Sequence, residues 1–101
     1  MVAKLARGIL PALCTPFDDS GENLAPDRVS PMIRALLDRG VNGFFACGGT
    51  GEGGAMTVPE RKQMAELTLK EVAGAVPVIV QVGATETDNA VELAKHAAAT
   101  G

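Results

Sequence analysis

The sequence predicts an α/β protein built on parallel strands, and three observations support this. Three short apolar runs alternate with three segments of helical periodicity, in the order βαβαβα. The runs are apolar at consecutive positions, as in strands that are covered on both faces. The helical segments carry apolar residues on one side, as expected of helices that cover a sheet.

A buried strand is expected over residues 8–14. This run is apolar without alternation. It ends at Thr15, which precedes Pro16 and is therefore disfavoured in helical geometry.

The first helix is expected where apolar residues recur at helical spacing from Val29 to Leu37, and Gly40 should end it. We expect Pro31 in its first turn. A helix that began at Ala25 would place this proline inside, where it removes a hydrogen bond and costs about 3 kcal/mol.

The second unit begins with a strand over residues 43–47, which leads into the glycine-rich loop Gly48–Gly54. The following helix has a marked start. Thr57 and Glu60 have the spacing of a capping box, in which each side chain accepts a hydrogen bond from the other residue's backbone N–H. An apolar stripe from Met64 to Ala73 should then face the core.

The third unit repeats the pattern, with a strand over residues 76–82 and a helix over the apolar positions between Ala90 and Ala98. Three parallel strands leave two unpaired edges. The chain is therefore expected to be part of a larger barrel or to be completed by a partner.

Composition excludes several functions. The 9 basic and 12 acidic residues are spread along the chain and give a net charge of -3, so we expect no nucleic-acid partner and no membrane surface. Residues 1–7 lack the apolar stretch of a secretory signal, and a cytoplasmic location is expected. Cys14 and Cys47 have no CxxC spacing and are expected to be buried free thiols.

The loop Gly48–Gly54 is the main candidate for binding, because ligands of parallel α/β proteins bind where the strands end. Small residues let backbone amides approach an anion, and Thr50 adds a hydroxyl. A dinucleotide site is disfavoured, since Glu52 puts negative charge near the pyrophosphate and no acidic residue follows the next strand at Val82. A P-loop would need a Lys-Ser/Thr pair, which is missing. The remaining alternative is a turn that needs glycine only for its backbone geometry.

Two further polar residues have structural interpretations. Glu52 is expected to stabilise the loop through hydrogen bonds to nearby amides rather than to act as a general base. His96 lies four residues after Glu92, and we expect the two to pair on the exposed side of the third helix.

The segment 48–52, Gly-Gly-Thr-Gly-Glu, resembles the Gly-Ser/Thr-Thr-Gly-Glu loop that the dihydrodipicolinate synthase and N-acetylneuraminate lyase family carries after its second strand. The resemblance covers almost the whole chain. It includes the family's opening strand, the entry to its second strand and its helix start, at residues 8–17, 40–43 and 56–61. The lyase branch is the more similar one at residues 78–84 and 91–97.

This resemblance implies a TIM (β/α)8 barrel, of which residues 1–101 would form the first three βα units and the N-terminal part of one domain. Family members form a Schiff base between a lysine on a later strand and pyruvate or another 2-oxo acid. A tyrosine relays protons, and neither metal nor organic cofactor takes part. The full-length protein is expected to be a homo-oligomer.

We expect no catalytic residue within the chain itself. It contains no tyrosine, and its lysines precede a strand or lie on helices, at Lys4, Lys62, Lys70 and Lys95. A Schiff-base lysine must instead project from a strand end into a desolvated pocket. The chain alone is therefore expected to be inactive.

Thr50 matches the family threonine that, with neighbouring amides, holds the pyruvyl carboxylate, so the resemblance implies a substrate-binding site at Gly49, Thr50 and Gly51. Gly49 departs from the family, because relatives have a serine or threonine whose hydroxyl binds substrate or passes a proton to the tyrosine. Strict synthase activity is then less expected than a lyase, a dehydratase or an altered specificity. The chain is interpreted as the front part of a class I pyruvate-dependent aldolase or lyase. The alternative is a noncatalytic module that assembles with a partner or binds an anion at Gly48–Gly54.

Overall fold

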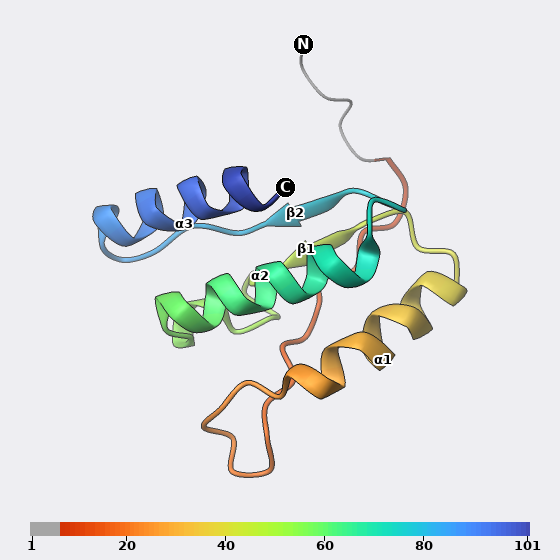
Figure 1. Cartoon of the computed structure of the whole chain (residues 1–101), viewed down its shortest axis with the longest axis horizontal. Helices are drawn as coiled ribbons and strands as arrows, with labels where there is room; N and C mark the ends of the chain where they lie inside the picture. Colours follow the sequence, from red (N-terminus) through yellow and green to blue (C-terminus); the bar gives the residue numbers. More distant parts are fainter. Residues whose placement is uncertain (1–6) are drawn as a thin grey trace.

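The computed structural model describes residues 7–101 of the chain. The expectations for residues 1–6, including the place of Lys4 and most of the segment expected to lack a secretory signal, lie outside this range. The elements, labelled in Figure 1, are α1 (Pro26–Asp38), β1 (Phe44–Ala46), the 3-10 turn η1 (Gly53–Ala55), α2 (Val58–Val72), β2 (Val78–Val80) and α3 (Thr87–Thr100).

β1 lies between two parallel neighbours. On one side it pairs with β2, with Phe44 opposite Val78 and Ala46 opposite Val80. On the other side Ala12 forms a parallel bridge to Phe45. The predicted parallel α/β arrangement is confirmed.

The strand expected over residues 8–14 is reduced to this single bridge. Phe45 N donates to the Pro11 carbonyl at 3.0 Å, and Leu13 N donates to the Phe45 carbonyl at 2.9 Å. Pro11 has no N–H, so it cannot donate the bond that would continue the ladder toward Gly43. Instead, the Asn42 side chain accepts from Ile9 N at 2.9 Å.

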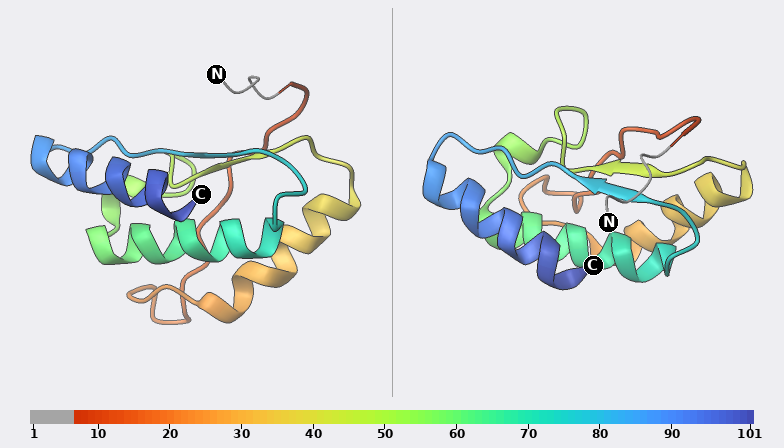
Figure 2. Two further views of the ribbon diagram at one scale, coloured as in Figure 1. Left: turned by 45° about the horizontal axis from the view of Figure 1, so that its top comes forward. Right: turned by 90° about the horizontal axis from the view of Figure 1, so that it is seen from above.

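The three helices lie on one side of the strands, and in both views of Figure 2 no helix of residues 7–101 lies on the other side. Phe44 and Ala46 are buried toward the helices, whereas Ile79 is 46% exposed. Helices and strands enclose a core that includes Leu13, Val29, Ile33, Phe44 and Met64. Within residues 7–101, no helix combines the length and apolarity that a membrane crossing requires.

Pro31 lies inside α1, so its predicted position in the first turn is wrong. The helix begins at Pro26, whose fixed φ suits the first helical position, and Ala25 before it is buried. Because the helix begins one turn earlier than predicted, Pro31 lies in its interior, where a proline costs about 3 kcal/mol. Complete burial of Val29 and Ile33 offsets this, since each such side chain contributes roughly 1.5–3 kcal/mol.

The predicted capping box at the start of α2 is confirmed. Thr57 N donates to Glu60 Oε1 at 2.9 Å, and Glu60 N donates to Thr57 Oγ1 at 3.2 Å. The helix ends at Val72, because Ala73 adopts a left-handed conformation with φ 50° and Gly74 follows with φ 78°. Ala73, which was expected in the buried stripe, is exposed at this helix end.

Polar contacts join α2 and α3 along their exposed sides. Lys62 Nζ lies 2.8 Å from Glu92 Oε2, and His96 Nε2 lies 3.0 Å from Glu66 Oε1. The expected pairing of His96 with Glu92 is therefore wrong, because residues of the neighbouring helix take both partners.

Cys14 is exposed, contrary to expectation. It lies in an apolar groove of about 350 Å³ between residues 11–14 and α1, which includes Met32 and Leu36. The sequence run is apolar throughout, but only the side chains that turn toward the helices, such as Leu13, are covered by the described residues.

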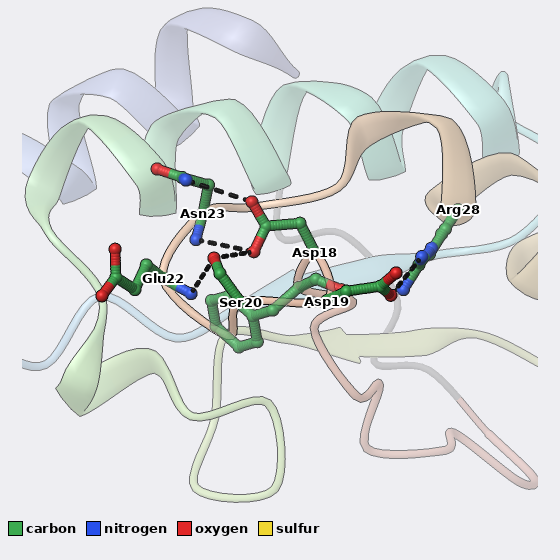
Figure 3. Close-up of polar contacts among 7 residues, drawn as sticks. Asp18, Asp19, Ser20, Glu22, Asn23 and Arg28 are labelled. Atoms are coloured by element: carbon green, nitrogen blue, oxygen red, sulfur yellow. Dashed lines mark hydrogen bonds and ion pairs between the residues drawn. The ribbon is translucent and has the colours of Figure 1, made fainter.

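A polar turn over residues 18–23 brings the chain back from the first segment to α1 (Figure 3). The Asp18 carboxylate accepts from Ser20 Oγ at 2.5 Å and from Asn23 Nδ2 at 3.0 Å. These two hydrogen bonds lower the pKa of Asp18 from its ordinary value of 3.8 to about 2. Arg28 Nη2, at the start of α1, donates to Asp19 Oδ1 at 3.0 Å.

The Asp18 carboxyl should titrate with a midpoint near 2 when followed by NMR. Because its pKa is lower in the folded turn, ionised Asp18 stabilises the turn fully above about pH 4, and this contribution is lost as pH falls through about 2. Ser20→Ala removes the largest cause of the shift and should raise the midpoint toward 3.8. A midpoint near 3.8 in the unaltered chain would show that the hydrogen-bonded turn does not form.

Candidate functional site

The glycine-rich loop connects the end of β1 to the start of α2. In the right-hand view of Figure 2 it rises on the side of the strands opposite to the helices. Two backbone hydrogen bonds close it: Glu52 N donates to the Gly49 carbonyl at 3.1 Å, and Gly53 N donates to the Gly48 carbonyl at 3.0 Å. The loop is therefore a defined turn at the carboxyl end of a parallel strand.

Close packing requires glycine at some positions of the loop. A Cβ at Gly53 would overlap the Cys47 carbonyl, and one at Gly51 would lie 2.7 Å from the carbonyl oxygen of Leu13. Backbone atoms cannot move aside as a flexible side chain can. The loop can approach the two strand ends this closely only because it lacks side chains there.

The three predicted binding residues lie together at the tip of this turn. Gly49 and Thr50 are exposed, and Gly51 is buried. Among residues 7–101, no acceptor takes the backbone N–H of Gly49, Thr50 or Gly51, or the Thr50 hydroxyl. At the edge where the strands end, the turn thus has three amides and one hydroxyl without an acceptor in this range, those of Gly49 and Thr50 on exposed residues.

Gly49 has free space around it. A Cβ at this position would meet no heavy atom of residues 7–101 within 4 Å, and its φ is not in the left-handed region. The surrounding residues therefore do not require glycine at this position.

Thr15 holds the loop from the first segment and was not predicted to do so. Its side chain is buried, and its hydroxyl donates to the Gly51 carbonyl at 2.5 Å. A threonine at the end of a buried apolar run needs a hydrogen-bond partner for its hydroxyl. This pattern in the sequence could have indicated that Thr15 makes a structural contact.

Cys47 and Glu52 flank the turn in left-handed conformations, with φ 59° and 60°. Cys47 is buried as predicted, and burial raises the pKa of its thiol, which disfavours a nucleophilic thiolate. The Glu52 side chain is exposed and forms no hydrogen bond within the described residues, so its expected contacts with nearby amides are absent.

Arg61, in the first turns of α2, is a second contact residue that the sequence did not reveal. Its side chain is 4% exposed. Nη1 donates to the Gly83 carbonyl at 2.7 Å, and Nη2 donates to the Gln81 carbonyl at 2.6 Å. Its Nε is also buried and has no hydrogen-bond partner among residues 7–101.

A cavity of about 230 Å³ lies beside Arg61, between the start of α2 and the loop that precedes α3. Its walls include Gly53, Gly54, Thr85 and Asn89. The candidate residues at the tip of the turn are not part of it. The cavity and the predicted carboxylate site are therefore separate places on the same loop.

No described lysine lies at a strand end. Lys62 and Lys70 are on α2, and Lys95 is on α3. Within residues 7–101 the site thus contains groups that can bind and orient an anion but no amine that could form a Schiff base there.

Comparison with known proteins identifies relatives along almost the whole chain. The sequence model of the Dihydrodipicolinate synthetase family matches residues 5–101. The 4-hydroxy-tetrahydrodipicolinate synthase of Bartonella quintana is 38% identical over 97 residues, which cover 96% of this chain and 33% of that protein. The enzyme of the same name from Methanoculleus marisnigri is 40% identical over 96 residues, covering 94% of this chain and 33% of its own length. The chain thus spans about a third of the length of these curated relatives.

Solved structures show the same likeness. YagE from E. coli K12, in complex with pyruvate, has a TM-score of 0.89 at 32% identity, over 98% of this chain and 33% of its own. N-acetylneuraminate lyase from Mycoplasma synoviae has a TM-score of 0.85 at 30% identity, over 90% of this chain and 32% of its own. These relatives are TIM barrels, so the predicted fold class is confirmed: the parallel βα units described above are part of such a barrel.

The packing around the loop predicts a sharp contrast between two adjacent glycines. Gly53→Ala should lower the free energy of unfolding by about 1–3 kcal/mol, because its Cβ would overlap the Cys47 carbonyl. Gly54→Ala, whose Cβ would meet none of the described residues within 4 Å, should change it by no more than about 0.5 kcal/mol. Urea unfolding followed by circular dichroism measures both. Equal effects of the two substitutions would contradict the packing described for the loop.

Proposed function

The chain belongs to the dihydrodipicolinate synthetase family, and from this we propose that it is the N-terminal part of one TIM-barrel domain in a class I pyruvate-dependent lyase. Such an enzyme makes or breaks a carbon–carbon bond of a 2-oxo acid. The Schiff-base lysine and the proton-relaying tyrosine then belong to later strands and loops of the full-length protein. The contribution of this chain is to bind and orient the substrate.

The observation that carries the proposal is the group of donors at Gly49, Thr50 and Gly51. Their amides and the Thr50 hydroxyl have no acceptor among the described residues, and they lie where β1 ends. Backbone amides in a tight turn favour an anion, and each hydrogen bond to a carboxylate contributes roughly 1.5–3 kcal/mol. A carboxylate with two acceptor oxygens fits this set of donors.

Pyruvate is the simplest substrate with this chemistry. YagE, which is similar to nearly all of this chain, was solved in complex with pyruvate, and so was the chloride-inhibited dihydrodipicolinate synthase of Acinetobacter baumannii. With its carboxylate held at the turn, a 2-oxo acid presents its carbonyl carbon to an amine from a later strand. The amine attacks this carbon, and water leaves to give an iminium ion. When a carbon–carbon bond breaks, the iminium ion accepts its electron pair and becomes an enamine; when the bond is made, the enamine donates this pair.

Gly49 bears on which reaction follows. The position offers an amide but no hydroxyl, and the free space around it shows that the surrounding residues do not exclude a side chain. We therefore expect steps that need a hydroxyl at this point, such as proton transfer toward a tyrosine, to be slow. Condensation of pyruvate with aspartate semialdehyde, the synthase reaction, should accordingly be weak.

Thr50→Val keeps the shape of the side chain and removes its hydroxyl. In the full-length enzyme this should reduce kcat/KM for the 2-oxo acid roughly ten- to a hundredfold, the effect of losing one hydrogen bond to a charged group. Borohydride trapping of the Schiff base at increasing pyruvate concentration should show the same loss at the binding step.

Thr50→Ser is the matched control, because it keeps the hydroxyl and should trap pyruvate much as the unaltered enzyme does. Unchanged concentration dependence in the valine variant would mean that Thr50 does not bind the carboxylate. The loop would then be a glycine turn without a binding role.

Gly49→Ser should raise turnover in a coupled synthase assay, because it restores a hydroxyl in a place that has room for it. Gly49→Ala fills the same space without a hydroxyl and should leave turnover near that of the unaltered enzyme. Strong synthase turnover with glycine at this position would contradict the proposed role of the missing hydroxyl.

A further inference from the structure

Arg61 is the one charged residue among residues 7–101 whose side chain is buried. Removing an ion from water costs several kcal/mol unless hydrogen bonds replace the lost hydration. Here two short bonds replace part of it, from Nη1 to the Gly83 carbonyl at 2.7 Å and from Nη2 to the Gln81 carbonyl at 2.6 Å, while Nε has no partner among residues 7–101. The guanidinium group is thus hydrogen-bonded to the backbone that follows β2.

Of the two residues that provide these carbonyls, Gln81 is hydrogen-bonded to the sheet and Gly83 is hydrogen-bonded to the Gln81 side chain. Gln81 N donates to the Ala46 carbonyl of β1 at 3.0 Å, which extends the β1–β2 ladder. Gly83 N donates to the side-chain oxygen of Gln81 at 3.1 Å. Hydrogen bonds therefore hold the segment after β2 against β1, and the Arg61 side chain joins the start of α2 to this segment.

The backbone of Arg61 also contacts the start of the glycine-rich loop. Its carbonyl accepts from the Cys47 thiol at 3.9 Å, and Cys47 is the last residue before the loop. After the loop the chain continues to the capping box at Thr57, so α2 contacts the residue before the loop and begins shortly after its end. One residue thus connects the ends of β1 and β2 to the base of the turn.

We propose that Arg61 is a positioning residue for the turn that carries Gly49, Thr50 and Gly51, an inference that rests on the proposed function of that turn. Arg61 does not contact these donors. By fixing α2 against the segment after β2, it sets the distance between the base of the loop and the strand ends, and hence the direction of the free amides. Arginine suits this role because its planar group carries several N–H donors and here spans two carbonyls.

Lys62 provides a matched control. It is adjacent in the chain and also joins α2 to the third unit, through Glu92 of α3, but both side chains of this pair are partly exposed and neither bonds to the segment after β2. If any contact between α2 and the third unit could position the turn, substitution of Arg61 and of Lys62 would affect pyruvate binding equally. The proposal requires that only Arg61 affects the turn.

Borohydride trapping in the full-length enzyme tests this. Arg61→Met should raise the pyruvate concentration for half-maximal trapping roughly tenfold, since amides that point away lose part of their hydrogen bonding. Arg61→Lys keeps the charge but cannot span both carbonyls, and it should show a clear part of the same shift. If the Arg61→Met variant does not fold, the Arg61→Lys variant alone tests the proposal. Lys62→Met should leave the half-maximal concentration within about twofold.

A double substitution separates positioning from general stability. If Arg61 acts through the turn, adding Arg61→Met to Thr50→Val should shift half-saturation by less than the product of the two single effects. A multiplicative result overturns the proposal, and so does a lowered Tm with unchanged half-saturation in both Arg61 variants. If Thr50→Val has no effect while Arg61→Met still shifts half-saturation, the role of Thr50 fails and the positioning role stands.

If the unaltered enzyme traps no pyruvate, only the proposed function is contradicted. Amide hydrogen exchange still tests whether Arg61 positions the turn. Arg61→Met should speed exchange at the amides of Glu52 and Gly53, whose hydrogen bonds close the turn, well beyond the effect of Lys62→Met, while α1 remains unchanged. Equal exchange at the turn in the two variants would show that Arg61 does not position it.

Discussion

The parallel hydrogen bonding of β1 on both of its sides is the constraint on which the rest of this structure depends. Phe45 bonds to the segment before it in the chain, and the neighbouring residues bond to β2 after it. Parallel neighbours cannot be joined by a tight turn, so each connection must return through a helix. The carboxyl ends of the strands therefore lie at the same edge of the sheet. Thr15, the glycine-rich turn and the carbonyl of Gln81 follow these ends and so lie at that edge.

The same pairing divides the strand side chains between two environments. Phe44 and Ala46 face the helices and are buried, whereas Ile79 on the opposite face is 46% exposed. In a closed TIM barrel this second face is lined by the side chains that fill the interior. The consecutive apolar residues of the strands are thus explained by two different cores, of which residues 7–101 complete only one.

Local signals in the sequence predicted the helices and their order well. The capping box at Thr57 and Glu60 acts within a few residues, so the sequence alone contains all of its parts. Pro31 was misjudged because the local cost of a proline was weighed without the buried contacts of Val29 and Ile33, which depend on the sheet. Cys14 was misjudged for a related reason, since an apolar run does not say which of its side chains a neighbouring helix covers.

The position of the glycine-rich turn could be predicted from the sequence, but the contacts that support it could not. Glycine spacing identified the turn, because a run of small residues at a strand end lets the backbone approach a ligand closely. Its supporting contacts join residues far apart in the chain: Thr15 lies 36 positions from Gly51, and Arg61 lies 20 positions from Gln81. No pattern within a short window contains such pairs, which exist only once the parallel strands are aligned.

The central place of β1 also has a consequence for how the chain folds. Its bridge to the first segment joins positions 12 and 45, and its first pair with β2 joins positions 44 and 78. Both pairings close loops of nearly equal length, so the entropy of closure favours neither. Both are also far from local, which slows folding relative to helical bundles of this size. The order of assembly is then set by the strength of the two helical crossovers, and α2, with its complete capping box, gives the β1–β2 pair the better-defined connection.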